Sequence, residues 1–314
     1  MTSSRIIWTS LLFATIAACG NYSNEDLEFM NAVPARQDLV ASIKSGPLVT
    51  ANEAELAKDT HNVVAAFNGA LDFLKVADLI RTYQPTSRIP DGRIWGPFPD
   101  NNHPGWQWRF VMTKDAVTAD KFNYSFDEQQ IGGGDTWYTL LDGWFIATGG
   151  GVRRGMGDFT LQTDAARMAG FQFELGDDGK SELKSLHIAY STADYPISVV
   201  MNLVLYPNAV TGDFTNTGSL DCTYEALQSG QGGLHFDATD SASGKSLSVD
   251  SRWLPTGRGR ADATYTDPTN GVSLTWNECW DDSFMSVYDN KPWATPPAPV
   301  TTGDATLCPD IPTL

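Results

Sequence analysis

Three carboxylates surround one cysteine near the C-terminus and are the densest group of acids that could do chemistry. They are Glu278, Asp281 and Asp282, around Cys279. Paired carboxylates hydrolyse glycosidic bonds when their separation and pKa values suit the two roles. They also bind calcium, although no full calcium-loop spacing is present. Acidic clusters are ordinary in a chain of formal net charge −17, so a solvated turn beside a disulfide is the favoured interpretation.

A second candidate is a set of arginines close to two glycine-rich turns, which is unexpected in so acidic a chain. The set is Arg153, Arg154, Arg252, Arg258 and Arg260. Guanidinium groups bind phosphate and carboxylate through two parallel hydrogen bonds, so lipid or lipopolysaccharide headgroups are possible ligands. Local pairing with nearby aspartates is favoured instead, at about 0–1 kcal/mol per exposed pair. Arg154, Arg258 and Arg260 are kept as candidate ligand contacts.

A third candidate is the aromatic, proline-rich loop over residues 94–108. Trp95, Trp106 and Trp108 lie there, together with His103. Indole rings can stack on sugar rings or on other flat, apolar ligands. Trp106 and Trp108 are also in phase with an apolar stripe, which favours an aromatic plug between a helix and a sheet.

Several patterns of catalytic and cofactor sites are missing from the sequence. There is no G-x-S-x-G and no H-E-x-x-H, and the four histidines are scattered. No cysteine pair has zinc-ligand or redox spacing. We therefore expect no metal or other cofactor and favour a non-catalytic protein, with an enzyme left open. The high acidity disfavours nucleic acid as a partner.

The N-terminus reads as an export signal. Arg5 precedes an apolar run from Ile6 to Ala18 that is too short for a transmembrane span. The residues before Cys19, Ile16-Ala17-Ala18, resemble the lipobox of bacterial lipoproteins. In that family the cysteine becomes the new N-terminus and carries acyl chains such as palmitate, which anchor the protein to the membrane.

The resemblance also implies a location. In such lipoproteins an aspartate after the cysteine often marks inner-membrane retention, so Gly20 favours the outer membrane, at either its periplasmic side or the cell surface. The layout is weakly similar to lipoproteins of the myxobacterial type, which pair a lipobox with an acidic, tryptophan-rich β domain. This resemblance implies no activity and no site residues.

The four cysteines allow at most one intramolecular disulfide once Cys19 carries lipid. Strand alternation points Cys222 toward the core, as a buried thiol. Cys279 alternates outward and can meet Cys308 in the tail. Export makes the bond plausible, and we predict the pair Cys279–Cys308.

Helical spacing predicts one long amphipathic helix over residues 52–82. Its stripe includes Val63, Phe67, Leu74 and Ile80. Gly69 is a possible kink, and Pro85 lies just beyond the helix end.

After Pro85 the apolar period changes from helical to alternating. About a dozen runs each have one apolar and one polar face, which is typical of antiparallel sheets. So large a sheet tends to curl or split. We therefore expect a mainly β fold: a curled antiparallel sheet forming an open half-barrel around the helix, with a closed barrel or a sandwich as alternatives.

The predicted organisation is a signal peptide at 1–18, a lipid-anchored tether with short helices at 19–50, one helix-plus-sheet domain at 51–290 and an irregular proline-rich tail at 291–314. The leading functional hypothesis is an envelope protein that binds a lipid, another hydrophobic ligand or a partner. A structural or interaction module of the outer membrane is second, and an enzyme acting on polysaccharide is third.

Overall fold

The computed structural model describes residues 22–44, 53–148, 152–168, 170, 181–207, 218–292 and 301–314, so the signal segment and Cys19 lie outside the described residues. The helices are α1 (Asn24–Asn31), α2 (Arg36–Leu39), α3 (Glu55–Ala70), η1 (Leu71–Leu74), α4 (Lys75–Thr82), α5 (Thr163–Met168) and η3 (Ala305–Leu307). The strands are β1 (Ser87–Ile89), β2 (Gly92–Pro99), β3 (Trp106–Lys114), β4 (Lys121–Gln130), β5 (Tyr138–Ala147), β6 (Gly155–Leu161), β7 (Ser181–Ser191), β8 (Ile197–Pro207), β9 (Gly218–Ala226), β10 (Gly232–Asp240), β11 (Ser246–Trp253), β12 (Gly259–Asp267), β13 (Val272–Trp280), β14 (Ser286–Asn290) and β15 (Thr301–Gly303).

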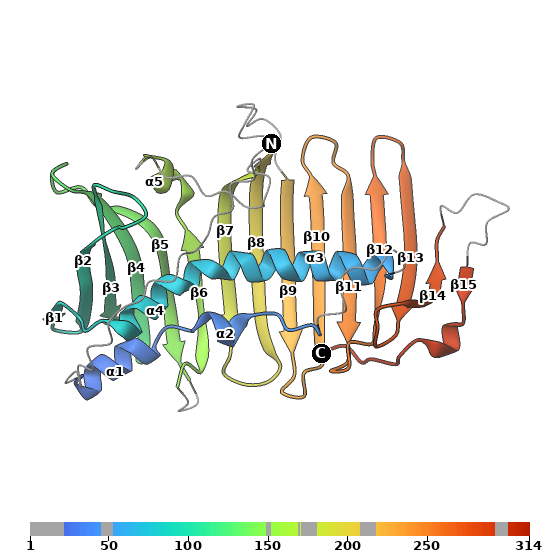
Figure 1. Ribbon diagram of the computed structural model, residues 1–314, viewed down its shortest axis with the longest axis horizontal. Helices are drawn as coiled ribbons and strands as arrows, with labels where there is room; N and C mark the ends of the chain where they lie inside the picture. The colour runs from blue at the N-terminus through green and yellow to red at the C-terminus, as the bar shows by residue number, and fades with distance from the viewer. Residues whose placement is uncertain are drawn as a thin grey trace.

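The strands form one antiparallel sheet in which each strand pairs with its neighbours in chain order. β1 and β15 lie at opposite ends of this sheet, which is open and extended (Figure 1). The mainly β, antiparallel prediction is confirmed, but the strongly curled half-barrel is wrong, as are the closed barrel and the sandwich. The apolar face is hidden by helices laid across it, so the sheet can bury that face without closing on itself.

The long helical run crosses the strands on one face of the sheet, called here the inner face (Figure 1). The predicted helix is confirmed as α3, η1 and α4, with the tighter 3₁₀ turn of η1 beginning just after Gly69. Phe67, Leu71 and Leu74 are fully or almost fully buried. Phe67 packs against Tyr224 of β9, with the ring centroids 5.9 Å apart. Apolar burial between helix and sheet is therefore the main force that holds the two layers together.

Aromatic side chains lie flat on the inner face because several of their cross-strand neighbours are glycines. Trp253 is directly opposite Gly232, and Trp280 is directly opposite Gly259. A Cβ atom at either glycine would come within 2.6 Å of the facing ring. Such close approach excludes any side chain there, and the covering layer can lie near the backbone of the sheet.

The segment before the long helix also belongs to the core. Phe29 of α1 and Leu39 of α2 are fully buried, although 19–50 was expected to be a tether. Ser23 caps α1 in a capping box with Asp26. Asp26, itself fully buried, accepts hydrogen bonds from Arg88 and Arg93, which ties α1 to β1 and β2. Burial opposes its ionisation, but these hydrogen bonds outweigh it and hold the pKa of Asp26 well below its usual range.

The predicted disulfide and the buried thiol of Cys222 are confirmed. Cys279 on β13 and Cys308 after η3 form a disulfide that attaches the C-terminal segment to the sheet. Part of the tail predicted as irregular also pairs with the sheet as β15. Cys222 is a free, buried thiol, and burial raises its pKa to about 12. A thiol so protonated and so shielded is inert in the folded chain.

Thiol titration tests this arrangement. In the mature chain with Cys19→Ser, we expect no reactive thiol in the native state, because Cys222 is buried and the other two cysteines are bonded. Denaturant without reductant should expose one thiol, and denaturant with reductant should expose all three. Two reactive thiols after reduction of the native protein, with Cys222 still protected, would confirm that the bond lies nearer the surface. Three thiols without reductant would contradict the disulfide.

Candidate functional site

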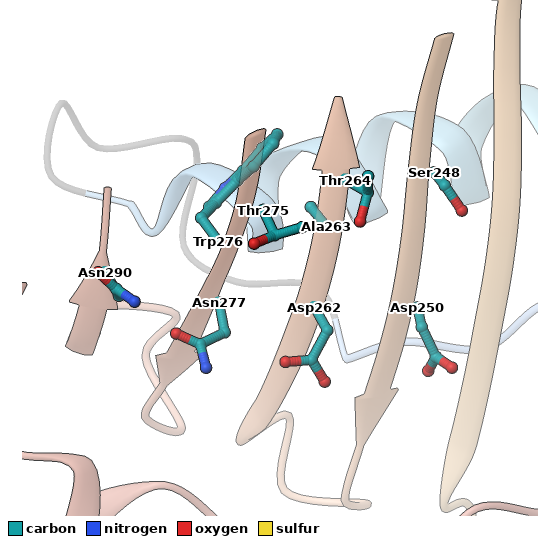
Figure 2. Close-up of a pocket in the computed structure, with 9 residues that line it drawn as sticks. All are labelled: Ser248, Asp250, Asp262, Ala263, Thr264, Thr275, Trp276, Asn277 and Asn290. Atoms are coloured by element: carbon teal, nitrogen blue, oxygen red, sulfur yellow. The ribbon is translucent and has the colours of Figure 1, made fainter. Parts of the chain in front are cut away.

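The face of the sheet that points away from the helices, called here the outer face, is polar. A shallow hollow of about 450 Å³ lies over β11, β12 and β13 (Figure 2). Two parallel rows of side chains line it. One row is Ser248, Thr264 and Thr275, and the second is Asp250, Asp262, Asn277 and Asn290. In each row, neighbouring strands place the residues directly opposite one another.

The second row sets like charges side by side. Asp250 of β11 is directly opposite Asp262 of β12, and two residues further along the same strands Arg252 is directly opposite Arg260. Like charges in direct cross-strand pairs are destabilising, and an alternating arrangement would avoid that cost. Each aspartate forms an ion pair with an arginine on its own strand: Asp250 with Arg252 at 3.0 Å, and Asp262 with Arg260 at 3.4 Å. The result is a band of hydrogen-bond acceptors beside a band of cations.

The C-terminal segment partly covers the arginine band. Arg258 donates a hydrogen bond to the carbonyl of Leu307, and Arg252 donates to the carbonyl of Ile311. Ile311 is itself buried. These arginines therefore hold the tail, and the aspartate band next to it stays open to solvent.

The remaining candidate arginines do not converge on one site. Arg153 pairs with Asp38 at 2.6 Å, which ties the turn before β6 to α2. Arg154 donates to the carbonyl of Thr192 and lies over the ring of Tyr195. Arg154 directly precedes β6, whereas Arg258 and Arg260 lie at the start of β12, several strands away. These three arginines therefore cannot bind one small anion together.

The tryptophans of the aromatic loop serve mainly to pack the end of the sheet. Trp95 is 1% exposed and donates to the carbonyl of Tyr83, so a surface ligand cannot reach it. Trp108 packs against Phe98, with centroids 4.9 Å apart, and Trp106 packs against Tyr138. Trp106 and Trp108 are partly exposed. Their positions fit the aromatic plug that the sequence favours.

The acidic group around Cys279 is not a paired-carboxylate site. Glu278 is buried on the inner face, where its Oε2 accepts a hydrogen bond from the backbone N–H of Leu56 at 2.6 Å. Asp281 accepts from the backbone N–H groups of Ser283 and Met285 and shapes its own turn. Asp282 is exposed. Glu278 therefore anchors the start of α3, and the other two belong to the loop before β14.

Sequence reasoning did not identify the paired rows of the outer face. Their residues alternate with apolar ones along each strand, so the polar side of each strand was evident. Which residues lie side by side depends on the register between strands, which a single sequence does not determine.

Comparison of the chain with protein-family models, with curated proteins and with solved structures finds no match. Within the residues described, none of the helices has the length and apolar character needed to cross a membrane.

The buried carboxyl of Glu278 makes a testable pH dependence. Burial raises its pKa, and the charge of Asp289 adds to this, although the N–H of Leu56 opposes them. A raised pKa in the folded state means that Glu278 stabilises the fold most below its unfolded pKa of about 4.3. That contribution is lost as pH rises through the folded pKa. The free energy of unfolding of Glu278→Gln, measured in urea, should therefore increase relative to that of the wild type from pH 4 to pH 8, because only the wild type loses stability as the carboxyl ionises.

The matched control is Asp282→Asn, which removes the same charge from an exposed position nearby. Its free energy of unfolding should stay parallel to that of the wild type over the same range. If the two variants follow the same pH dependence, burial of Glu278 is not the cause.

Proposed function

We propose that this chain is a lipid-anchored, non-catalytic binding protein of the cell envelope, and that its outer face holds a hydroxyl-rich glycan. The proposed class of ligand rests on one observation, the two rows of polar side chains open to solvent over β11, β12 and β13. The anchor at Cys19 and the outer-membrane location rest on the lipobox resemblance. This keeps the binding role expected from the sequence but moves the ligand from hydrophobic to polar.

The filled inner face argues against a hydrophobic ligand. A lipid groove between helix and sheet would need open apolar surface there. The helix residues Phe67, Leu71 and Leu74 are at most 1% exposed, and so are Met201 and Leu234 of the sheet. The layer that was expected to hold a lipid is instead occupied by the protein's own side chains.

The outer rows have the chemistry of a sugar site. Carboxylate and amide oxygens accept hydrogen bonds from hydroxyl or amino groups, while threonine and serine hydroxyls can donate or accept. The rows run across strands about 4.8 Å apart, so successive strands offer a repeated set of partners to an extended chain. The net charge of −17 repels acidic polysaccharides. A neutral glycan, or one with free amino groups, is therefore the favoured ligand.

Affinity electrophoresis through gels that contain soluble glycans tests the ligand. The mature chain with Cys19→Ser should be retarded by a neutral or amino-bearing glycan and not by an acidic one. Replacing both aspartates, as Asp250→Asn with Asp262→Asn, should weaken retardation by an amino-bearing glycan roughly tenfold, since charge-assisted hydrogen bonds are about twice as strong as neutral ones. Asp282→Asn, outside the rows, should bind like the wild type. Equal binding by all three proteins would exclude the rows as the site.

Metabolic labelling with radioactive palmitate tests the anchor. The wild-type chain should take up label and fractionate with the outer membrane, because two or more acyl chains give stable attachment. Cys19→Ser should be unlabelled and should leave the membrane fraction. Label that persists in Cys19→Ser would place the lipid on another residue and refute the lipobox assignment.

A further inference from the structure

The loop between β2 and β3 brings two side chains beside a carboxylate of β4. Asp100 and His103 lie in this loop, and Glu128 lies on β4. One ligand atom from each residue lies within 4.8 Å of the other two. His103 Nδ1 and Asp100 Oδ2 are already 2.5 Å apart. Two residues of one loop and a carboxylate of a separate strand are thus gathered at one point near the end of the sheet.

Glu128 makes this more than a surface cluster. Its side chain is 4% exposed, and its Oε2 has no hydrogen-bond partner among the described residues. Burial raises its pKa to about 8, with a smaller contribution from the charge of Asp100. A buried carboxyl oxygen without a partner costs about 1–3 kcal/mol or more. The neighbouring Gln129, by contrast, donates to Gly134 and accepts from Gln107, so nearby amides are satisfied.

We propose that Asp100, His103 and Glu128 bind a divalent transition-metal ion of the zinc class. One imidazole and two carboxylates are a donor set that zinc accepts, whereas calcium and magnesium prefer oxygen donors throughout. The Oδ1 of Asp100 accepts from the backbone N–H of Asn102 at 2.8 Å, which orients the carboxylate. Its Oδ2 is hydrogen-bonded to His103 Nδ1, and binding of the ion would replace that hydrogen bond with a bond from each atom to the metal. A cation between the three residues supplies the partner that Glu128 lacks.

The position of the site suggests what the ion does. His103 is half exposed, so a fourth position on the ion would be open to water or to a ligand. The ion would also fasten the 100–105 loop to β4, beside the partly exposed Trp106. This site lies at the opposite end of the sheet from the rows over β11, β12 and β13, and it does not depend on the proposed glycan function.

Isothermal titration calorimetry tests the proposal. The metal-free mature chain with Cys19→Ser, carrying no affinity tag, is titrated with zinc chloride and separately with calcium chloride. We expect one equivalent of zinc to bind saturably and calcium to bind at least about tenfold more weakly. His103→Gln and Glu128→Gln should each weaken zinc binding by about tenfold or more.

The matched control is His235→Gln. His235 pairs with Asp237 at 3.1 Å in an exposed position, so it has the same two donor types without a buried third ligand. This variant should bind zinc like the wild type. Circular dichroism without metal verifies that each variant is folded. If Glu128→Gln does not fold, the visible absorption of Co²⁺ bound to the wild type and its loss in His103→Gln decide the matter. No saturable binding, or unchanged binding in His103→Gln, overturns the proposal.

Discussion

The structure depends on keeping one face of an open fifteen-strand sheet dry along its whole length. Fifteen strands span about 67 Å, whereas the helical run Glu55–Thr82 is about 42 Å long. One helix therefore cannot cover the face, and α1 with the segment through α2 completes the cover. The cross-strand pairs of glycine with aromatic residues make this possible, because rings such as Trp253 lie flat and the covering layer needs little height. Trp253 also donates to the carbonyl of Ser42 in that layer.

The ends and the outer side of the sheet follow from the same arrangement. An open sheet has two edges, and long exposed edges invite pairing with other chains. Here β1 and β15 are three residues each, which leaves little edge to extend. The disulfide at Cys279 fixes the tail next to one edge. Because the inner face is filled, the proposed glycan site lies on the outer face, where Asp250 and Asp262 are aligned in a like-charge pair.

Much of the fold could be predicted from local pattern. Helical spacing identified Phe67 and Leu74 as the buried stripe, and strand alternation separated the inward Cys222 from the outward Cys279. The degree of curl could not be predicted, because alternation shows which side of a strand is apolar and not how far successive strands twist or shift. The burial of Phe29, in the segment expected to be a tether, could not be predicted for a similar reason: its partner Phe122 lies far along the chain.

Both candidate sites depend on contacts between strands, which no local sequence pattern shows. Each site depends on a different contact. The aspartate row needs the register that sets Asp250 opposite Asp262, whereas the proposed metal site needs a loop folded back on β4. His103 was noted as part of an aromatic loop, but nothing local linked it to Glu128, which only the pairing of β3 with β4 brings near. The Oε2 of Glu128 is buried without a partner among the described residues, whereas the side-chain amide of Gln129 beside it is hydrogen-bonded to Gln107 and Gly134. The proposed cation would give this buried carboxyl oxygen the partner that it lacks among the described residues.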